Sequence, residues 1–316
     1  MIRWRARWWV WVGIGLPAAS PALELISTQV GPHSYYVQGE LDVASAENRG
    51  FNANAGFVVT PQGVVVFDAL GTPALGQALV REIRRRTSLP IRYLILSHYH
   101  ADHAYGAEAL RAAGAQLWMH REARHYLDSP RARERLAQRR GLLPEAFAPD
   151  FTLPLPDRWL DADERLELGG VTIDLRYVGP AHAPDDLVML VPEDGVLFSG
   201  DLLFVGRIPT LGEAGSRDWL RALERLDDAH VRVFVPGHGP ASTDFRAAID
   251  GMRTYLLDLR AQMAVAVQDM LSFEDAYRQA DWRRWRDLPA FEQAHRANAY
   301  TVFLELERES LAAASG

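Results

Sequence analysis

The run Ser97-His98-Tyr99-His100-Ala101-Asp102-His103 is the feature that most constrains what this chain can fold into. It directly follows residues 91–96, a continuous apolar segment of the length of a buried strand, and it precedes a helical pattern. Because side chains alternate along a strand, the imidazoles of His98 and His100 point to the same side and can bind one ion. Asp102 and His103 offer an oxygen and a nitrogen a few residues further on. The run therefore predicts a two-metal site at a strand end, and a chance grouping of polar residues is the alternative.

Three more candidate ligands each follow a predicted strand. His182 comes after residues 171–178, Asp201 after residues 196–199, and His238 after residues 231–235. Glycines beside them let the backbone turn sharply. Each residue alone would be an ordinary loop residue, but sites in α/β proteins collect where strands end. We therefore expect all three to join the first cluster.

The other polar candidates are weaker. Asp68 ends a predicted buried strand, and we expect it to orient a ligand imidazole rather than to cap a helix. Oxyanion-binding side chains could come from Tyr99, Asn52 or Asn54, although packing and turn formation are equally good interpretations. The other histidines are expected on the surface or in the core, with a supporting role open for His120; they are His33, His120, His125, His230 and His295.

Composition excludes several kinds of chemistry. The chain has no cysteine, so disulfides, thiolate nucleophiles and cysteine-bound metals are excluded. All 34 basic residues are arginine, which excludes a Schiff-base lysine and a P-loop. The formal charge of -7 argues against a nucleic-acid partner. Any metal must be held by imidazole and carboxylate.

The first 22 residues resemble an export signal. Arg3, Arg5 and Arg7 precede a short apolar stretch, and Ser20-Pro21-Ala22 places small residues where a signal peptidase cleaves. The stretch is shorter than the ~20 residues of a membrane-spanning helix. We expect cleavage after Ala22, no stable membrane anchor afterwards, and a periplasmic or secreted protein; an uncleaved anchor is the alternative.

The remaining pattern alternates strands and helices twice. It predicts two β-sheets packed together with helices outside, in a domain over residues 23–243, followed by a helical extension over residues 244–316 that includes Trp282 and Trp285. Residues 141–159 are proline-rich and are expected to form a loop that could overhang the site.

The H-x-H-x-D-H run, Gly179-Pro180-Ala181-His182, Ser199-Gly200-Asp201 and Pro236-Gly237-His238 together resemble the metallo-β-lactamase superfamily. The resemblance covers roughly residues 56–240 and implies an α/β fold, the αβ/βα four-layer sandwich of two mixed sheets flanked by helices. Residues 64–68 look like the family's first motif. The sequence Ala183-Pro184-Asp185-Asp186 departs from relatives that often carry Ser or Thr and Gly there, which leaves the pocket rim undefined.

The resemblance also implies a ligand set. His98, His100 and His182 would hold one ion, Asp102, His103 and His238 a second, and Asp201 would bridge both. Two zinc ions sharing a hydroxide would then hydrolyse an ester, thioester, lactone or amide of a small molecule. Asp102, which could steer the water or relay its proton, and Asp201 are the candidate catalytic residues.

Finer features of the resemblance point away from true lactamases. Those enzymes generally place Cys or Ser where this chain has Asp201, whereas hydroxyacylglutathione hydrolases place Asp. The export signal and the helical tail look more like periplasmic SoxH-type members. Two alternatives remain open. One is an iron-dependent dioxygenase of the same superfamily, since iron accepts the same donors. The other is a metal-dependent binding protein that docks an unknown protein partner through Trp282-Arg283-Arg284-Trp285.

Overall fold

Strands with two buried faces form the centre of the structure, a computed structural model that describes residues 23–212, 215–226 and 230–315. In β4 (Gly63–Phe67), Val64 and Val66 pack under helices, whereas Val65 and Phe67 point into the space between two sheets. This division follows from the alternation of side chains along a strand. It makes β4 apolar throughout, as in sheets that are covered on both sides.

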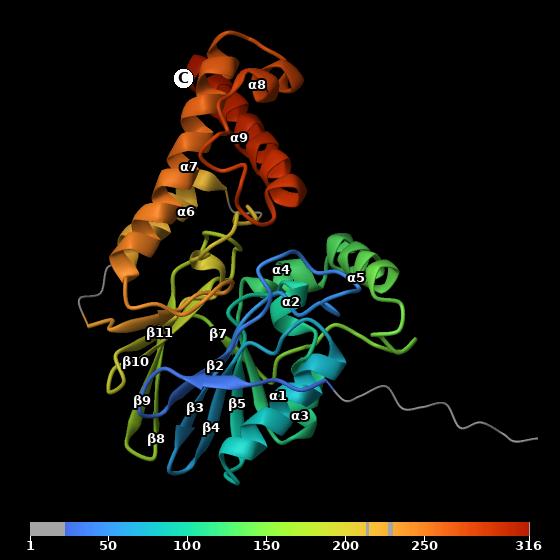
Figure 1. Ribbon diagram of the computed structural model, residues 1–316, viewed down its shortest axis with the longest axis vertical. Coiled ribbons are helices and arrows are strands. Elements are labelled where there is room, and N and C mark those ends of the chain that lie inside the picture. Colours follow the sequence, from blue (N-terminus) through green and yellow to red (C-terminus); the bar gives the residue numbers. More distant parts are fainter. Residues whose placement is uncertain (1–22, 213–214, 227–229, 316) are drawn as a thin grey trace, which may run out of the picture.

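Two sheets pack face to face (Figure 1). The first has the order β1-β2-β3-β4-β5-β6-β7, and the second has the order β12-β11-β10-β9-β8. Neighbours are parallel from β4 to β7 and between β11 and β12, and antiparallel elsewhere. The other strands of the first sheet are β1 (Ser27–Gln29), β2 (Ser34–Val37), β3 (Ala55–Thr60), β5 (Ile91–Ile95), β6 (Gln116–His120) and β7 (Arg158–Leu160). Those of the second are β8 (Glu164–Leu168), β9 (Val171–Tyr177), β10 (Leu187–Val191), β11 (Val196–Phe198) and β12 (Val233–Val235).

Helices cover both outer faces of this sandwich. The first sheet carries α1 (Pro73–Arg86), α2 (Ala101–Ala104), α3 (Ala107–Ala112), α4 (Ala123–Leu127) and α5 (Pro130–Leu142) on its side. The second carries α6 (Ser216–Arg225) and α7 (Phe245–Gln268), and α8 (Phe273–Gln279) and α9 (Arg296–Ser315) pack beside α7 beyond its edge. A 3-10 turn at Gly200–Leu202 and a π-helical turn at Phe291–His295 complete the described elements. The predicted αβ/βα sandwich with a helical C-terminal region is confirmed.

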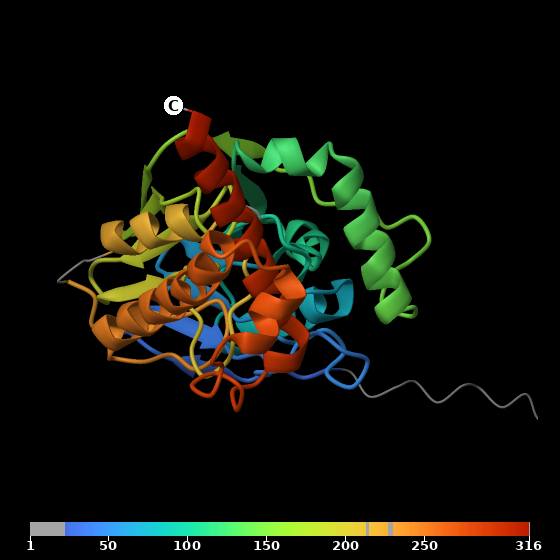
Figure 2. The same ribbon diagram turned by 90° about the horizontal axis from the view of Figure 1, so that it is seen from above.

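The C-terminal helices lie over one edge of the sandwich (Figure 2). Leu256 and Leu259 of α7 share a core with Leu197 and Phe234 of the second sheet. The boundary at residue 243 stays a prediction. The expectation of helix throughout this region is wrong at residues 280–290, which form turns.

Both tryptophans of that turn segment are core residues. Trp282 is 9% exposed and Trp285 is 8% exposed, and the indole nitrogen of Trp282 donates to the carbonyl of Tyr277. They pack against the helices, and their segment forms turns rather than the expected helix.

The expected overhanging loop also lies elsewhere. Phe147 and Phe151, in residues 141–159, contact the ring of Tyr105 and join the core beneath the first sheet. The helix α5, which begins at Pro130 with Ser129 as its cap, reaches the site instead. A proline is tolerated at that first helical position, so it starts a second helix here.

The expected signal sequence, residues 1–22, lies outside the described residues. Within the part of the chain that is described, none of the helices combines the length and the apolar character needed to cross a membrane.

Candidate metal centre

Four strand ends bring the predicted ligands to one edge of the sandwich, near α2 in Figure 1. The 98–103 segment follows β5, His182 follows β9, Asp201 follows β11 and His238 follows β12. Gly237 allows a close approach, because a Cβ built there would lie 2.0 Å from Oδ1 of Asp201. The local glycine therefore brings the β11 and β12 turns together.

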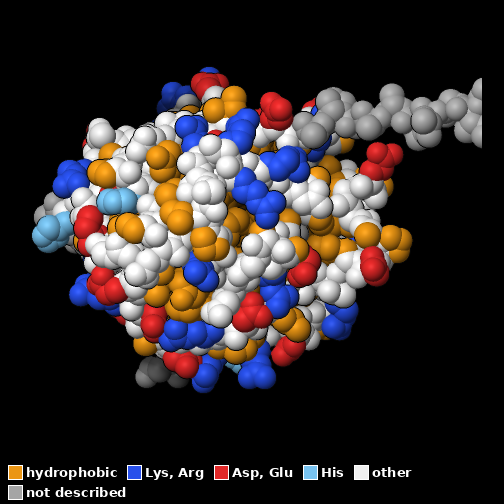
Figure 3. Space-filling view, turned by 90° about the horizontal axis from the view of Figure 1, so that it is seen from below, with side chains coloured by type: hydrophobic (Ala, Val, Ile, Leu, Met, Phe, Trp, Pro, Cys, Tyr) orange, Lys and Arg blue, Asp and Glu red, His pale blue; other side chains and the backbone are white. Residues whose placement is uncertain are grey.

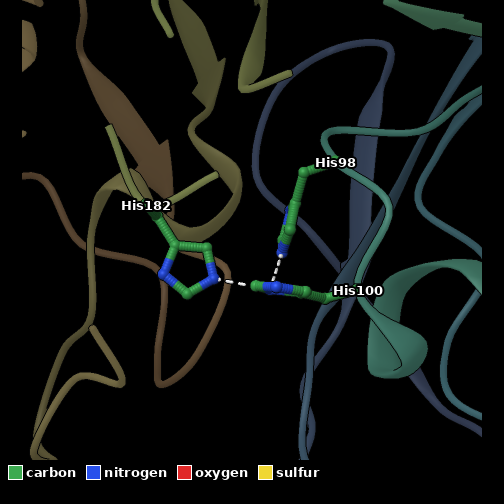
Figure 4. Close-up of side chains that lie close together, drawn as sticks. All are labelled: His98, His100 and His182. Carbon is green, nitrogen blue, oxygen red and sulfur yellow. Dashed lines mark hydrogen bonds between the residues drawn. The ribbon is translucent and has the colours of Figure 1, made fainter. Parts of the chain in front are cut away.

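Three histidines form the first group of candidate ligands (Figure 4). His98 and His100 come from one loop, and His182 reaches them from the other sheet. Nδ1 of His100 lies 3.0 Å from Nε2 of His98 and 2.7 Å from Nε2 of His182. Nitrogens bound to one tetrahedral zinc at ~2.0–2.1 Å lie about 3.3 Å apart, so the three rings need to separate only slightly to hold one ion. We call His98, His100 and His182 the three-histidine group.

Asp201 lies between this group and a second one, made of Asp102, His103 and His238. Its Oδ1 lies 3.1 Å from Nε2 of His103 and 3.3 Å from Nε2 of His238. Its Oδ2 lies 3.3 Å from Nε2 of His182. One carboxylate thus presents a different oxygen to each group.

Backbone carbonyls fix two of the imidazoles. Nδ1 of His182 donates to the carbonyl of Thr210 at 2.9 Å, and Nδ1 of His238 donates to that of Asn52 at 2.6 Å. With the proton on Nδ1, the lone pair is on Nε2, the nitrogen that faces Asp201. These hydrogen bonds assign the tautomer that a metal ligand needs.

Asp68 fixes two more imidazoles, that of His103 directly and that of His98 through Ser97. Its Oδ2 accepts from Nδ1 of His103 at 2.8 Å and from the hydroxyl of Ser97 at 2.8 Å, and its Oδ1 accepts from the Ser97 amide at 2.7 Å. The Ser97 hydroxyl in turn accepts from Nδ1 of His98 at 2.9 Å. The predicted contact between Asp68 and a candidate ligand is confirmed, while Thr72 caps α1.

The charges around these histidines suit a cation. Burial and repulsion between neighbouring imidazoles lower the pKa values of His98 and His100 well below the usual 6.5, and burial lowers that of His182 to about 4. The three-histidine group is therefore neutral at pH 7, as ligands must be. Although burial lowers the pKa of His103, Asp201 and Asp68 raise it well above 6.5. Positive charge is thus favoured between His103 and Asp201.

Two buried atoms support the same conclusion. Nε2 of His103 and Oδ1 of Asp201 are both buried and lie 3.1 Å apart, but their geometry does not meet that of a hydrogen bond. Buried polar atoms are normally hydrogen-bonded. A donor set of imidazole and carboxylate, with two such atoms directed at a shared point, fits zinc.

Three expected oxyanion donors have other partners. The ring of Tyr99 stacks on Tyr126 with centroids 3.8 Å apart, so its packing role holds. The Asn54 amide donates to the carbonyls of Pro236 and Gly239, 2.8 Å each, and so supports the His238 turn. The Asn52 amide donates to Oδ2 of Asp102 at 2.8 Å. These contacts support packing for Tyr99 and turn formation for Asn54, while an oxyanion role for Asn52, which lines the cavity, stays a prediction.

The five other histidines lie outside the candidate metal groups found among the described residues. His120 stacks on Tyr177, His33 bonds Asp194, and His295 is buried beside Tyr255. His125 and His230 are exposed. The surface-or-core interpretation therefore holds for them.

The structure adds site residues that we did not predict. Ser97 connects His98 to Asp68, and a cavity of about 150 Å³ beside the candidate ligands is lined by Arg131, Arg135, Arg139 and Arg207. The α5 arginines recur every four residues on a charged helix, which was a usable signal. Asp185 and Asp186 are buried rather than at a pocket rim, and Asp186 accepts from the Ala183 amide.

Comparisons with known proteins agree with this geometry. A model of the metallo-beta-lactamase superfamily matches residues 48–238. The chain is 33% identical over 167 residues to hydroxyacylglutathione hydrolase GloC of Haemophilus influenzae, covering 49% of this chain and 72% of that protein. It is 25% identical over 193 residues to the type 2 metallo-beta-lactamase of Elizabethkingia meningoseptica, covering 60% and 69%.

Two solved structures share the fold over more of the chain. The sec-alkylsulfatase Pisa1 from Pseudomonas sp. has a TM-score of 0.70 at 17% identity, covering 89% of this chain and 50% of that one. A metallo-beta-lactamase family protein from Thermus thermophilus has a TM-score of 0.64 at 22% identity, covering 88% and 94%. Taken with the converging histidines and aspartates, these matches show that the chain belongs to the metallo-beta-lactamase superfamily and is a hydrolase of that fold.

Proposed function

We propose that this protein is an exported dinuclear zinc hydrolase that cleaves an ester, thioester, lactone or amide bond of a small molecule. The observation that carries the proposal is the position of Asp201. Its two oxygens face different ligand groups, with Nε2 of His103 at 3.1 Å and Nε2 of His182 at 3.3 Å. A bridging carboxylate of this kind serves two ions rather than one.

The three-histidine group would hold one zinc ion, and Asp102, His103 and His238 would hold the second. Such a pair lowers the pKa of a shared water from 15.7 toward ~7 and polarises the substrate carbonyl, which supplies a nucleophile at neutral pH. Asp201 would keep the two ligand groups at a fixed separation. Asp68 would keep His103 in the binding tautomer.

Asp102 is held as a carboxylate beside the cavity. Burial raises its pKa, but the charges of Arg139, His103 and His238 lower it well below 3.8. Its Oδ2 accepts from the Asn52 amide at 2.8 Å, and Arg139 lies 3.4 Å from Oδ1. Fixed in this way and charged at neutral pH, Asp102 is able to orient a water by accepting a hydrogen bond from it.

A substrate panel tests the proposal. We expect the zinc-loaded protein to hydrolyse at least one member of a panel of nitrocefin, lactones, thioesters and aryl esters, and His98→Ala to abolish this turnover with its circular dichroism unchanged. His120→Ala is the matched control, because that histidine stacks on Tyr177 and should be dispensable for turnover. Iron in the purified protein together with oxygen uptake would instead identify a dioxygenase. Failure on the whole panel together with tight capture of a partner would identify a binding protein.

The cellular site of action is a separate part of the proposal. The arginines and the apolar stretch within residues 1–22 support export to the periplasm or the medium, with no membrane anchor after cleavage. The net charge of -7 supports a small molecule rather than nucleic acid as the partner. N-terminal sequencing of the exported protein should begin at Leu23; a chain retained in the membrane with Met1 intact would contradict this.

A further inference from the structure

One wall of the cavity beside the candidate ligands is made of arginines. Arg131, Arg135 and Arg139 are four residues apart on α5, so they share one face of that helix. All three line the cavity, together with Arg207 from the other side of the sandwich. The only acidic side chains among its described lining residues are Asp102 and Asp201, both candidate metal ligands.

The carboxylates within the site do not neutralise Arg135 and Arg139 together. Arg139 lies 3.4 Å from Oδ1 of Asp102, whereas Arg135 has no carboxylate within ion-pair distance among the described residues. If metal ions bind Asp102 and Asp201, those two charges are already compensated. Arg135 and Arg139 then leave an excess of positive charge facing the cavity.

Arg207 adds an independent observation. It is only 5% exposed, its guanidinium donates to the carbonyls of Asp42 at 3.1 Å and Ile208 at 3.2 Å, and its Nη1 lies 3.4 Å from Nδ1 of His238. No described carboxylate forms an ion pair with it. Burying an arginine without an ion-paired carboxylate is unfavourable for folding, and an anionic ligand in the cavity would supply the missing countercharge.

The arginines at the cavity differ from the general surface. On the face seen in Figure 3, arginine and acidic side chains are intermixed, and neither sign dominates. The chain as a whole carries a net charge of -7. A positive wall on an acidic protein therefore attracts anions specifically to this cavity.

We propose that the substrate is an anion, with a carboxylate or another oxyanionic group that binds the α5 arginine wall while its scissile bond lies at the metal centre. This inference rests on the proposed function and names its substrate class. Guanidinium groups suit the role because their planar donors match the two oxygens of a carboxylate. A cavity of about 150 Å³ restricts the bound part of the substrate to a few heavy atoms between the two sites.

Binding of matched ligands to the zinc-loaded protein tests the inference without any turnover. Succinate and glutarate each have a monoamide, succinamate and glutaramate, that keeps the shape and loses one charge. We expect calorimetry at low salt to show roughly ten- to hundredfold tighter binding of at least one dicarboxylate than of its monoamide. The preference should shrink as the ionic strength rises.

Two variants on the same helix locate the effect. Arg135→Gln should remove most of the dicarboxylate preference. Arg133→Gln should keep it, because Arg133 is exposed and two residues away, on the opposite side of α5. The inference would be overturned if the unaltered protein bound dicarboxylate and monoamide equally, or if both variants lost the dicarboxylate preference to the same extent.

Acetohydroxamate, a chelating probe for zinc, separates the two proposals. It should bind the unaltered protein and Arg135→Gln equally. If it binds neither while the dicarboxylate preference persists, the anion site stands and the metal centre is contradicted. If it binds both while the unaltered protein shows no dicarboxylate preference, the metal centre stands and the anion site is contradicted.

Discussion

Replacing Asp68 with asparagine should weaken zinc binding without removing a ligand. The Asp68 carboxylate accepts three hydrogen bonds, one of them from Nδ1 of His103 at 2.8 Å. An asparagine has one acceptor oxygen, so its NH2 group must face at least one donor. If that donor is His103, the imidazole moves its proton to Nε2, which is the nitrogen that faces Asp201.

The size of the effect follows from that contact. Losing a partner that orients a metal-bound histidine typically costs 10–100-fold in metal affinity, or about 1.4–2.8 kcal/mol. We expect the loss for the ion held by His103, with a smaller effect on the three-histidine group through Ser97. The metal-free variant should also lose about 1–3 kcal/mol of unfolding free energy, because one buried donor is left without an acceptor.

Zinc titration against a chromophoric chelator measures both ions. Asp194→Asn is the matched control, since Asp194 is also a buried carboxylate with three hydrogen bonds, to His33 and Ser34, far from the site in the fold. It should lower the unfolding free energy and leave both zinc affinities unchanged. The reasoning about Asp68 would be refuted if Asp68→Asn bound zinc as tightly as the unaltered protein, or if Asp194→Asn lost as much zinc affinity as Asp68→Asn.

Three further predictions concern ligation and stability. Removing the imidazole in His98→Ala should lower zinc content by about one ion per chain while the fold persists, and unchanged metal content by mass spectrometry would place the site elsewhere. In Gly237→Ala, the added Cβ would lie 2.0 Å from Oδ1 of Asp201, so we expect displacement of that carboxylate and lower zinc content; retention of both ions would show that the turn can yield. Asp185→Asn should raise the unfolding free energy by about 1–3 kcal/mol at pH 8, because burial and the neighbouring Asp186 raise the pKa of Asp185 well above 3.8. A carboxyl whose pKa is raised in the folded state opposes folding at high pH, and this penalty fades as the pH falls toward 3.8. The gain in unfolding free energy of Asp185→Asn, measured by denaturant titration, should therefore fade over the same range. A gain that does not change with pH would contradict the raised pKa of Asp185.

The main strands and the convergence of the candidate ligands could be predicted because their signals are local. The apolar segment ending at Leu96 and the H-x-H-x-D-H run after it fix both a strand and the direction in which its polar end points. Gly237 marks a turn that only a residue without a Cβ allows. Because His182 and His238 also follow strands, their position beside the distant 98–103 segment could be predicted without knowing any side-chain contact.

Other parts of the structure depend on contacts that no local pattern shows. Tyr99 and Asn54 are polar residues beside the ligands, but stacking and backbone carbonyls satisfy them. Trp282 sits in a sequence with helical character, yet burial of its ring holds a turn there instead. The role of Arg207 emerges only when the turn after β11 meets the Asp42 loop.

Metal analysis of the purified, zinc-loaded and dialysed protein tests the central claim most directly. The position of Asp201 between two ligand groups predicts close to two zinc ions per chain, and about one in His238→Ala, which leaves the three-histidine group intact. Fewer than about one metal per chain in the unaltered protein would contradict the two-ion centre.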